Sequence, residues 1–407
     1  MKEEYYLQHP RTQLFYKVLA HVSTIESTID LTWWGYTFPK YVGWFYHLQC
    51  NVVRLFGKCV VVSQILFIIL NYQTIDKSVF IIAITITPLG ALVGIKAESA
   101  KAECYVNLMK NFMDKVHIHS IYRKNENNEF VKKKVIQIER VSRFTAYFLV
   151  ILIAINCLSW MLKPTLHNIK HFEEIMNKSM EFQYYIYFWT PLDYKYNLRD
   201  YIIIHTLCIY LGATAVTVIV TFDIFNFIAV FHVVAHIQIL KNNVKSNWSD
   251  DFNESEKKGY LVSILEYHAY IIRIFGEVQS AFGLNVASNY LQNLIEDGLF
   301  LYQIMNGEKE NVLMYGLMII LYLGGLIFLS IVLEEIRRQN YDLCEYVYAL
   351  PWEGMSLENQ KIFVVFLQRT QPDLEFETVC GMKAGVKPAF SIVKSMFSYY
   401  VMINSRF

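Results

Sequence analysis

Residues 312–333 read VLMYGLMIILYLGGLIFLSIVL and contain no charged side chain. The hydrocarbon core of a bilayer holds no water that could bond exposed backbone groups, so a segment that crosses it must be a helix of about 20 mostly apolar residues. This stretch has that length and that composition. It therefore predicts a membrane-spanning helix, which ends at the acidic residue Glu334.

Apolar stretches of this kind recur along the chain. Together with the first they give seven predicted spans, which are residues 51–72, 79–95, 144–162, 201–240, 281–305, 312–334 and 388–403. Over the whole chain 54% of the residues are hydrophobic and 18% are charged, whereas a soluble domain has about 25% charged residues. We predict an all-α integral membrane protein with seven transmembrane helices.

Two of the predicted spans carry polar residues. The stretch 201–240 is about twice the length that a bilayer needs, and beyond Phe222 it contains Asp223, Asn226, His232 and His236. We expect this second half to continue as a cytoplasmic helix, with the two histidines on its solvated face because no third metal ligand accompanies them. The stretch 281–305 must turn its polar residues toward protein or water; these are Asn285, Asn289, Gln292, Asn293, Glu296 and Asp297.

The loop charges predict the orientation, because lysine and arginine resist translocation across the membrane. The largest group of them lies between the second and third spans, at Lys96, Lys101, Lys110, Lys115, Arg123, Lys124, Lys132, Lys133, Lys134, Arg140 and Arg143. With seven spans, this side also holds the N-terminus, so we expect a cytoplasmic N-terminus and an extracellular C-terminus. The glycosylation sequons at Asn247 and Asn253 lie on the predicted cytoplasmic side and argue weakly against this orientation.

Other classes of protein fit the sequence less well. A G-protein-coupled receptor has its N-terminus outside, and the last span here has no Asn-Pro-x-x-Tyr motif. The net charge of +1 argues against a nucleic-acid partner. The seven cysteines lack the spacing of a zinc site, and no catalytic constellation is present, so we expect neither a metal, nor a cofactor, nor an enzyme. A secondary transporter stays open as an alternative.

The C-terminal third carries the most specific motifs. Residues 333–348 read LEEIRRQNYDLCEYVY, and they are followed by Trp352, by Lys361 and by residues 367–372, LQRTQP. The last span ends in Ser398-Tyr399-Tyr400. This sequence of motifs resembles the cytoplasmic run and closing helix of insect odorant receptors, although Lys387-Pro388 departs from the Pro-Leu that is common there.

The resemblance implies an odorant-gated, non-selective cation channel subunit in the plasma membrane of a sensory neuron dendrite. Such a subunit forms a heterotetramer with the co-receptor Orco and binds a small volatile odorant. The chain would then divide into an N-terminal cytoplasmic segment (1–50), six helices with the ligand pocket (51–333), a cytoplasmic anchor region (334–387) and a pore-lining helix with a short tail (388–407). An insect gustatory receptor, which shares this architecture, is the related alternative.

The last span has one polar face. Ser391, Ser395, Ser398, Met402 and Ser405 recur at steps of three and four, which is the spacing of one helix face. A polar stripe on a spanning helix needs water or close helix packing beside it. The periodicity does not decide between these, but the resemblance favours a pore, with Met402 and Arg406 near its extracellular gate.

The resemblance also implies a closed ligand pocket in the outer halves of the second, third, fourth and sixth helices. Such a pocket needs apolar and aromatic walls with one or two polar groups. We expect Trp160 to be its main aromatic wall, although a tryptophan near a span end is also typical of the interfacial aromatic belt. The candidate pocket residues are Phe80, Ile84, Asn156, Trp160, His205, Ile209, Tyr315 and Tyr322.

Overall fold

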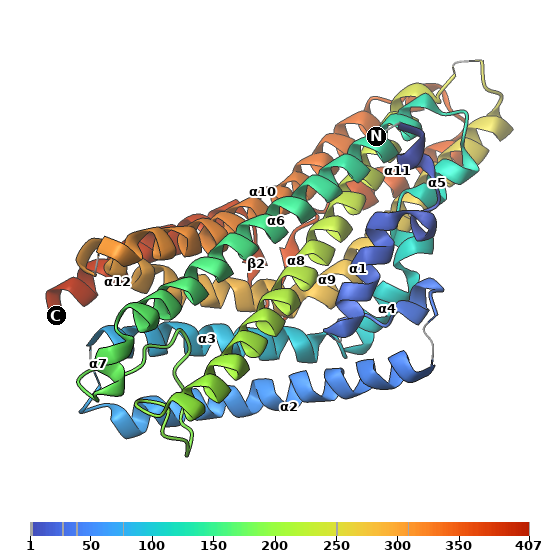
Figure 1. Ribbon diagram of the computed structural model, residues 1–407. Helices are drawn as coiled ribbons and strands as arrows, with labels where there is room; N and C mark the ends of the chain where they lie inside the picture. The colour runs from blue at the N-terminus through green and yellow to red at the C-terminus, as the bar shows by residue number, and fades with distance from the viewer. Residues whose placement is uncertain are drawn as a thin grey trace.

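A computed structural model describes residues 3–26, 28–37, 40–75, 77–249, 251–307 and 309–406 of the chain. The described part is a bundle of long helices (Figure 1), which confirms the predicted all-α class. The α-helices are α1 (Leu14–Ile25), α2 (Lys40–Asn71), α3 (Lys77–Ser99), α4 (Glu103–Asn111), α5 (His119–Lys124), α6 (Glu129–Lys170), α7 (Phe172–Met176), α8 (Leu198–Ser246), α9 (Glu254–Asn306), α10 (Val312–Tyr348), α11 (Leu357–Thr370) and α12 (Val386–Arg406).

Short elements join these helices. A π-helical turn, η4 (Phe112–Val116), interrupts the connection between α4 and α5. Strands β1 (Phe376–Glu377) and β2 (Lys383–Ala384) form a small antiparallel hairpin before α12. The 3₁₀ turns are η1 (Glu3–Leu7), η2 (Pro10–Thr12), η3 (Leu31–Trp34), η5 (Lys309–Asn311) and η6 (Trp352–Gly354).

Each predicted span falls within one helix, to within a residue at its ends. Among the described residues, α2, α3, α6, α8 and α10 are long and apolar enough to cross a membrane. The other two predicted spans lie in α9, which carries many polar residues, and in the shorter helix α12. Hydropathy alone therefore identifies five of the seven predicted spans, and the remaining two depend on how their polar faces are packed.

The long helices extend far beyond the thickness of a bilayer. Helix α8 has 49 residues and α9 has 53, so at 1.5 Å per residue they are roughly 74 and 80 Å long, compared with a hydrocarbon core of about 30 Å. The two ends of the chain lie at opposite ends of the bundle (Figure 1). We call the end with α7, residues 177–197 and the C-terminus the loop end, and the end with α5, α11 and the N-terminus the N-terminal end.

Helix α8 forms the core of the N-terminal half of the bundle. From Val218 to Leu240 every residue is buried except Asp223 and Gln238, which are partly exposed. The expected solvated position of His232 and His236 is therefore wrong, because both side chains are 0% exposed. The segment from η4 to α5 covers them: the Ile118 N–H donates to His232 Nδ1 at 3.4 Å, and His236 Nε2 lies 2.9 Å from the Val116 carbonyl oxygen.

The polar residues of α9 face the interior of the bundle, as predicted. Asn285 and Asn289 donate to Asp223 Oδ1 on α8 at 3.2 and 3.4 Å. The ammonium of Lys96, on α3, forms an ion pair with the same oxygen at 2.7 Å and is fully buried. The prediction that Lys96 lies in a loop is wrong, because the residue is part of α3 and its ion pair with Asp223 joins α3 to α8.

Helix α12 packs closely against α9. A Cβ on Gly298 would lie 2.9 Å from Cβ of Tyr399, so the two helices approach without room for a side chain at this point. Ala389, Ile392 and Met396 are buried on this side of α12. The serine stripe lies on the other side of the helix, where Ser391 and Ser398 are exposed in the single chain.

Candidate functional site

A pocket of about 150 Å³ lies in the loop-end half of the bundle. Helices α2, α3, α6, α8 and α10 form most of its wall, and residues of the 177–197 loop complete it. Most of the surrounding side chains are apolar or aromatic, which is typical of a site for a small organic molecule. The lining residues are Val53, Gly57, Val60, Gln64, Ile86, Leu89, Gly90, Val93, Asn156, Cys157, Trp160, Met161, Tyr185, Ile186, Leu211, Gly212, Thr214, Ala215, Val216, Ile219, Met318 and Tyr322.

Several polar side chains in this lining have no hydrogen-bond partner among the described residues. They come from α2, α6 and the loop, and each is at most 7% exposed. A buried polar atom without a partner costs about 1–3 kcal/mol. The atoms are Gln64 Oε1, Asn156 Nδ2, Trp160 Nε1 and Tyr185 OH, and we call them the unpartnered pocket atoms.

The structure brings together some of the sequence-predicted pocket residues. Asn156, Trp160 and Tyr322 line the pocket. Tyr315 lies behind this wall, with its ring edge-on to Trp160 at a centroid distance of 5.8 Å. His205 stacks on the ring of Tyr201 at 5.3 Å and is not part of the lining.

Three further predicted residues lie away from the pocket lining. Phe80 packs edge-on against Tyr72 near the loop end of α3, with ring centroids 6.0 Å apart. Ile84 is half-buried on the same helix, and Ile209 is 39% exposed on α8. None of these three side chains lines the pocket.

The 177–197 loop contributes lining residues that sequence reasoning missed. It folds back onto the bundle: Phe182 stacks on Tyr201 at 4.0 Å, and the Trp189 N–H donates to the Ser63 carbonyl oxygen on α2 at 3.0 Å. This places Tyr185 and Ile186 in the pocket wall. The available signal was the aromatic run at residues 183–189, QYYIYFW, which is unusual for a solvated loop.

A smaller chamber of about 50 Å³, with mostly apolar walls and a few polar side chains, lies next to the pocket. Its lining includes the Lys96–Asp223 ion pair. Tyr322 and Ile219 line both the pocket and this chamber, so their side chains stand between the two. The ring of Tyr322 stacks on Phe300 of α9 at a centroid distance of 6.3 Å.

The predicted pore residues lie along one face of α12. The hydroxyls of Ser391, Ser395 and Ser398 donate to backbone carbonyls one turn earlier, at 3.2, 3.0 and 3.3 Å. Met402 is 45% exposed on the same face. The side chain of Arg406 lies outside the described part of the chain.

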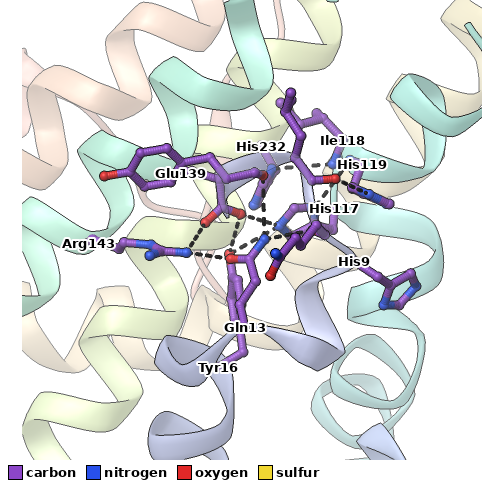
Figure 2. Close-up of polar contacts among 12 residues, drawn as sticks. His9, Gln13, Tyr16, His117, Ile118, His119, Glu139, Arg143 and His232 are labelled. Carbon is purple, nitrogen blue, oxygen red and sulfur yellow. Dashed lines mark hydrogen bonds and ion pairs between the residues drawn. The ribbon is translucent and has the colours of Figure 1, made fainter. Parts of the chain in front are cut away.

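A second group of buried polar residues lies at the N-terminal end, and Figure 2 shows it. Glu139 Oε1 accepts hydrogen bonds from Tyr16 OH at 3.0 Å and from His117 Nε2 at 2.7 Å, while Oε2 accepts one from Arg143 at 3.1 Å. The rings of His117 and His232 are 4.2 Å apart. We call Tyr16, His117, His119, Glu139, Arg143 and His232 the histidine cluster.

The hydrogen bonds of His117 determine its tautomer. The backbone N–H of His119 donates to Nδ1 at 3.1 Å, so the ring proton is on Nε2, which donates to Glu139. Burial holds the pKa of His117 well below its ordinary value, and the neighbouring histidines and Arg143 add to this effect. The ring is therefore neutral in the folded protein. In the described part of the chain, no three His, Cys, Asp or Glu side chains are arranged to hold a metal ion.

The fold matches known structures over almost the whole chain. The insect olfactory receptor OR5 from Machilis hrabei superposes with a TM-score of 0.76 at 15% sequence identity, and the match covers 96% of this chain and 97% of that one. The same receptor in complex with eugenol superposes with a TM-score of 0.74 at 15% identity, covering 96% and 98%. The chain therefore has a seven-helix membrane fold. No curated protein matches the sequence.

The sequence also matches a family model. The model describes the 7tm odorant receptors, and the match extends over residues 104–397, more than half of the chain. It includes the whole C-terminal third that carries the motifs, and it points to a receptor and not to an enzyme. The chain belongs to the 7tm odorant receptor family.

Proposed function

We propose that this protein is the odorant-binding subunit of an odorant-gated, non-selective cation channel. It assembles with the co-receptor Orco into a heterotetramer in the plasma membrane of a sensory neuron. Its N-terminus is cytoplasmic, and its loop end faces the outside. The loop charges of the sequence support this orientation.

The pocket is the observation that carries the ligand-binding part of this proposal. It has apolar and aromatic walls, with a few buried polar atoms left without partners. A structure of the related receptor from Machilis hrabei contains eugenol. We assign the pocket of this chain to a small volatile odorant, with Asn156, Trp160 and Tyr322 in its wall.

Helix α12 supports the channel part of the proposal. It is anchored to α9 through the close contact at Gly298, whereas its serine stripe is left uncovered in the single chain. A stripe of hydroxyls on a spanning helix is stable beside a water-filled path. In a tetramer the stripes of four such helices would line one pore, with Met402 and Arg406 toward the outer gate.

Gating then requires a difference in affinity between two states of the bundle. An odorant that binds the open and closed states equally well shifts nothing, however tightly it binds. Tyr322 and Ile219 form the wall between the pocket and the smaller chamber, which contains the Lys96–Asp223 ion pair. We propose that the odorant favours the open state through this wall.

The direct test is to record currents from cells that express this chain with and without Orco. We expect odorant-evoked cation currents in excised patches without GTP, and only when both subunits are present. Currents that require GTP would contradict the channel. Currents that persist without Orco would contradict the heteromer and favour a self-sufficient channel of the gustatory kind.

The pore assignment has its own test. We expect a membrane-impermeant thiol reagent to reduce the current of Ser395→Cys or Ser398→Cys channels, because these positions face the proposed pore. Ile392→Cys is the matched control, since Ile392 is 7% exposed and faces α9 on the same helix. Equal modification of both faces, or of neither, would contradict a pore along the serine stripe.

A further inference from the structure

We propose that the pocket selects compact, neutral odorants that carry an oxygen acceptor, which the donors Asn156 Nδ2, Trp160 Nε1 and Tyr185 OH bind. This inference rests on the proposed function and specifies its ligand class. It follows from the chemistry of the unpartnered pocket atoms and from the size of the pocket.

The donors come from two different parts of the chain. Asn156 and Trp160 are one turn apart on α6, so their side chains lie on the same helix face. Tyr185 reaches the pocket from the 177–197 loop. The helix alone places only two of the three donors in the pocket wall. The fold of the loop adds the third, Tyr185.

The balance of donors and acceptors indicates what the ligand must offer. The unpartnered pocket atoms comprise the N–H donors of Asn156 and Trp160, the Tyr185 hydroxyl, which can donate or accept, and the acceptor Gln64 Oε1. A carbonyl or ether oxygen can accept from these donors, and a hydroxyl can in addition donate to Gln64. A hydrocarbon leaves all four atoms without partners, so it lacks the hydrogen bonds that an oxygen-bearing ligand gains.

The pocket also restricts the charge of the ligand. Among the described residues that line it, none is an acid, a lysine, an arginine or a histidine. A charged ligand that enters an apolar site without a countercharge loses its hydration and gains no ion pair. The site therefore fits neutral ketones, ethers, esters and alcohols better than ammonium ions or carboxylates.

The volume restricts the size of the ligand. The pocket has a volume of about 150 Å³. An engineered apolar cavity of about this volume in another protein binds benzene. A single ring with a short oxygen-bearing substituent is therefore the best fit.

Isosteric ligand pairs test this inference on the wild-type receptor co-expressed with Orco. Anisole and ethylbenzene differ by an ether oxygen in place of a methylene, and acetophenone and α-methylstyrene differ by a carbonyl in place of a vinylidene group. We expect the oxygen-bearing member of each pair to open the channel at about tenfold lower aqueous concentration, because a site with buried donors rejects an analogue that lacks the acceptor.

Two conservative variants test the assignment of the donors. Trp160→Phe and Tyr185→Phe each remove one polar atom and keep an aromatic ring in place. We expect each variant to narrow the preference for the oxygen-bearing ligand by about 3- to 10-fold, which is the loss of one hydrogen bond. A change in packing alone shifts both members of a pair together, so the ratio of their potencies isolates the hydrogen bond, and surface labelling of the cells shows that the variant is folded.

Tyr315→Phe is the matched control, because this ring contacts Trp160 without lining the pocket. Equal potency of the two members of each pair in the wild type would overturn the inference but would leave the odorant-gated channel intact. A preference that survives in both Trp160→Phe and Tyr185→Phe would overturn it as well. If the receptor reaches the cell surface with Orco and no odorant evokes current, the proposed function itself fails.

Discussion

The pocket and the histidine cluster are two groups of buried polar side chains that both include residues of α6, and they differ in how their central polar atoms are satisfied. In the histidine cluster, both carboxylate oxygens of Glu139 accept hydrogen bonds from side chains of other segments or of the next turn. In the pocket, Asn156 Nδ2 and Trp160 Nε1 have no partner among the described residues. The fold satisfies the carboxylate at the centre of the cluster, although His232 Nε2 has no partner among the described residues, whereas our proposal assigns the pocket atoms to a ligand.

The largest effect should follow the loss of the carboxylate at the centre of the cluster. Glu139→Ala would leave Tyr16, His117 and Arg143 without their shared acceptor, and breaking a buried ion pair in this way costs about 3–5 kcal/mol. We expect a large drop in the thermal stability of the detergent-solubilised protein. Glu3→Ala is the control, since the Glu3–Arg140 pair is exposed and such pairs contribute less than about 1 kcal/mol. An equal loss of thermal stability in Glu139→Ala and Glu3→Ala would contradict a stabilising role of the cluster.

Acidification should affect the cluster next. His117 is neutral in the fold because burial lowers its pKa, whereas in the unfolded chain it takes up a proton as the pH falls below 6.5. Its contribution to stability is therefore complete above pH 6.5 and is lost as the pH decreases, by at most about 1.4 kcal/mol per pH unit. We expect the melting temperature to fall from pH 7 to pH 5, and to fall less in His117→Gln. The exposed residue His21, changed to Gln, should leave the slope as in the wild type.

A change in pocket volume should act on ligands and leave the fold intact. A Cβ added at Gly212 would lie 3.7 Å from Cε2 of Tyr185, an ordinary contact that narrows the pocket. For Gly212→Ala we expect the half-maximal concentration of ring-sized odorants to rise about fivefold, the equivalent of about 1 kcal/mol of overpacking. Gly276→Ala, on α9 where no atom lies within 4 Å of the added carbon, should leave the response unchanged.

The smallest effect on stability should come from the pocket donor on α6. Asn156→Leu removes a buried amide whose Nδ2 has no partner, so the free energy of unfolding should stay the same or rise, and no stability should be lost. Thermal melts under the conditions used for Glu139→Ala would measure it. A loss as large as that of Glu139→Ala would show that Asn156 is structural and would contradict the comparison.

The sequence was sufficient to predict the helices, because hydropathy is a local property. The apolar stretches at 51–72, 79–95, 144–162 and 312–334 lie in α2, α3, α6 and α10, and only the first extends past its helix, by one residue. The polar residues from Asn285 to Asp297 correctly indicated that α9 faces the interior. Length and periodicity predict such features without knowledge of distant contacts.

Burial by residues that are distant in the sequence could not be predicted from the local sequence pattern. His232 and His236 look like a solvated pair, yet residues more than a hundred positions earlier in the chain cover them. In the same region Trp34 Nε1 donates to the Met109 carbonyl oxygen at 2.8 Å and fixes the N-terminal segment against α4. Only the tertiary fold brings these segments together.

The candidate pocket shows the same limit. Aromatic composition and position on α6 and α10 indicated Trp160 and Tyr322, and both line the pocket. The place of Tyr185 depends on how the 177–197 loop folds back onto α2 and α8, which no helical periodicity predicts. Which polar atoms remain unpartnered depends on that loop as well.

Helix α9 also has a mechanical consequence. Its 53 residues form one uninterrupted rod, and at roughly 80 Å a tilt of one degree about one end displaces the other by roughly 1.4 Å. The contact with α12 at Gly298 lies close to one end of this rod. A lever of this length converts a very small angular strain at the far end into a displacement comparable to the radius of a water molecule.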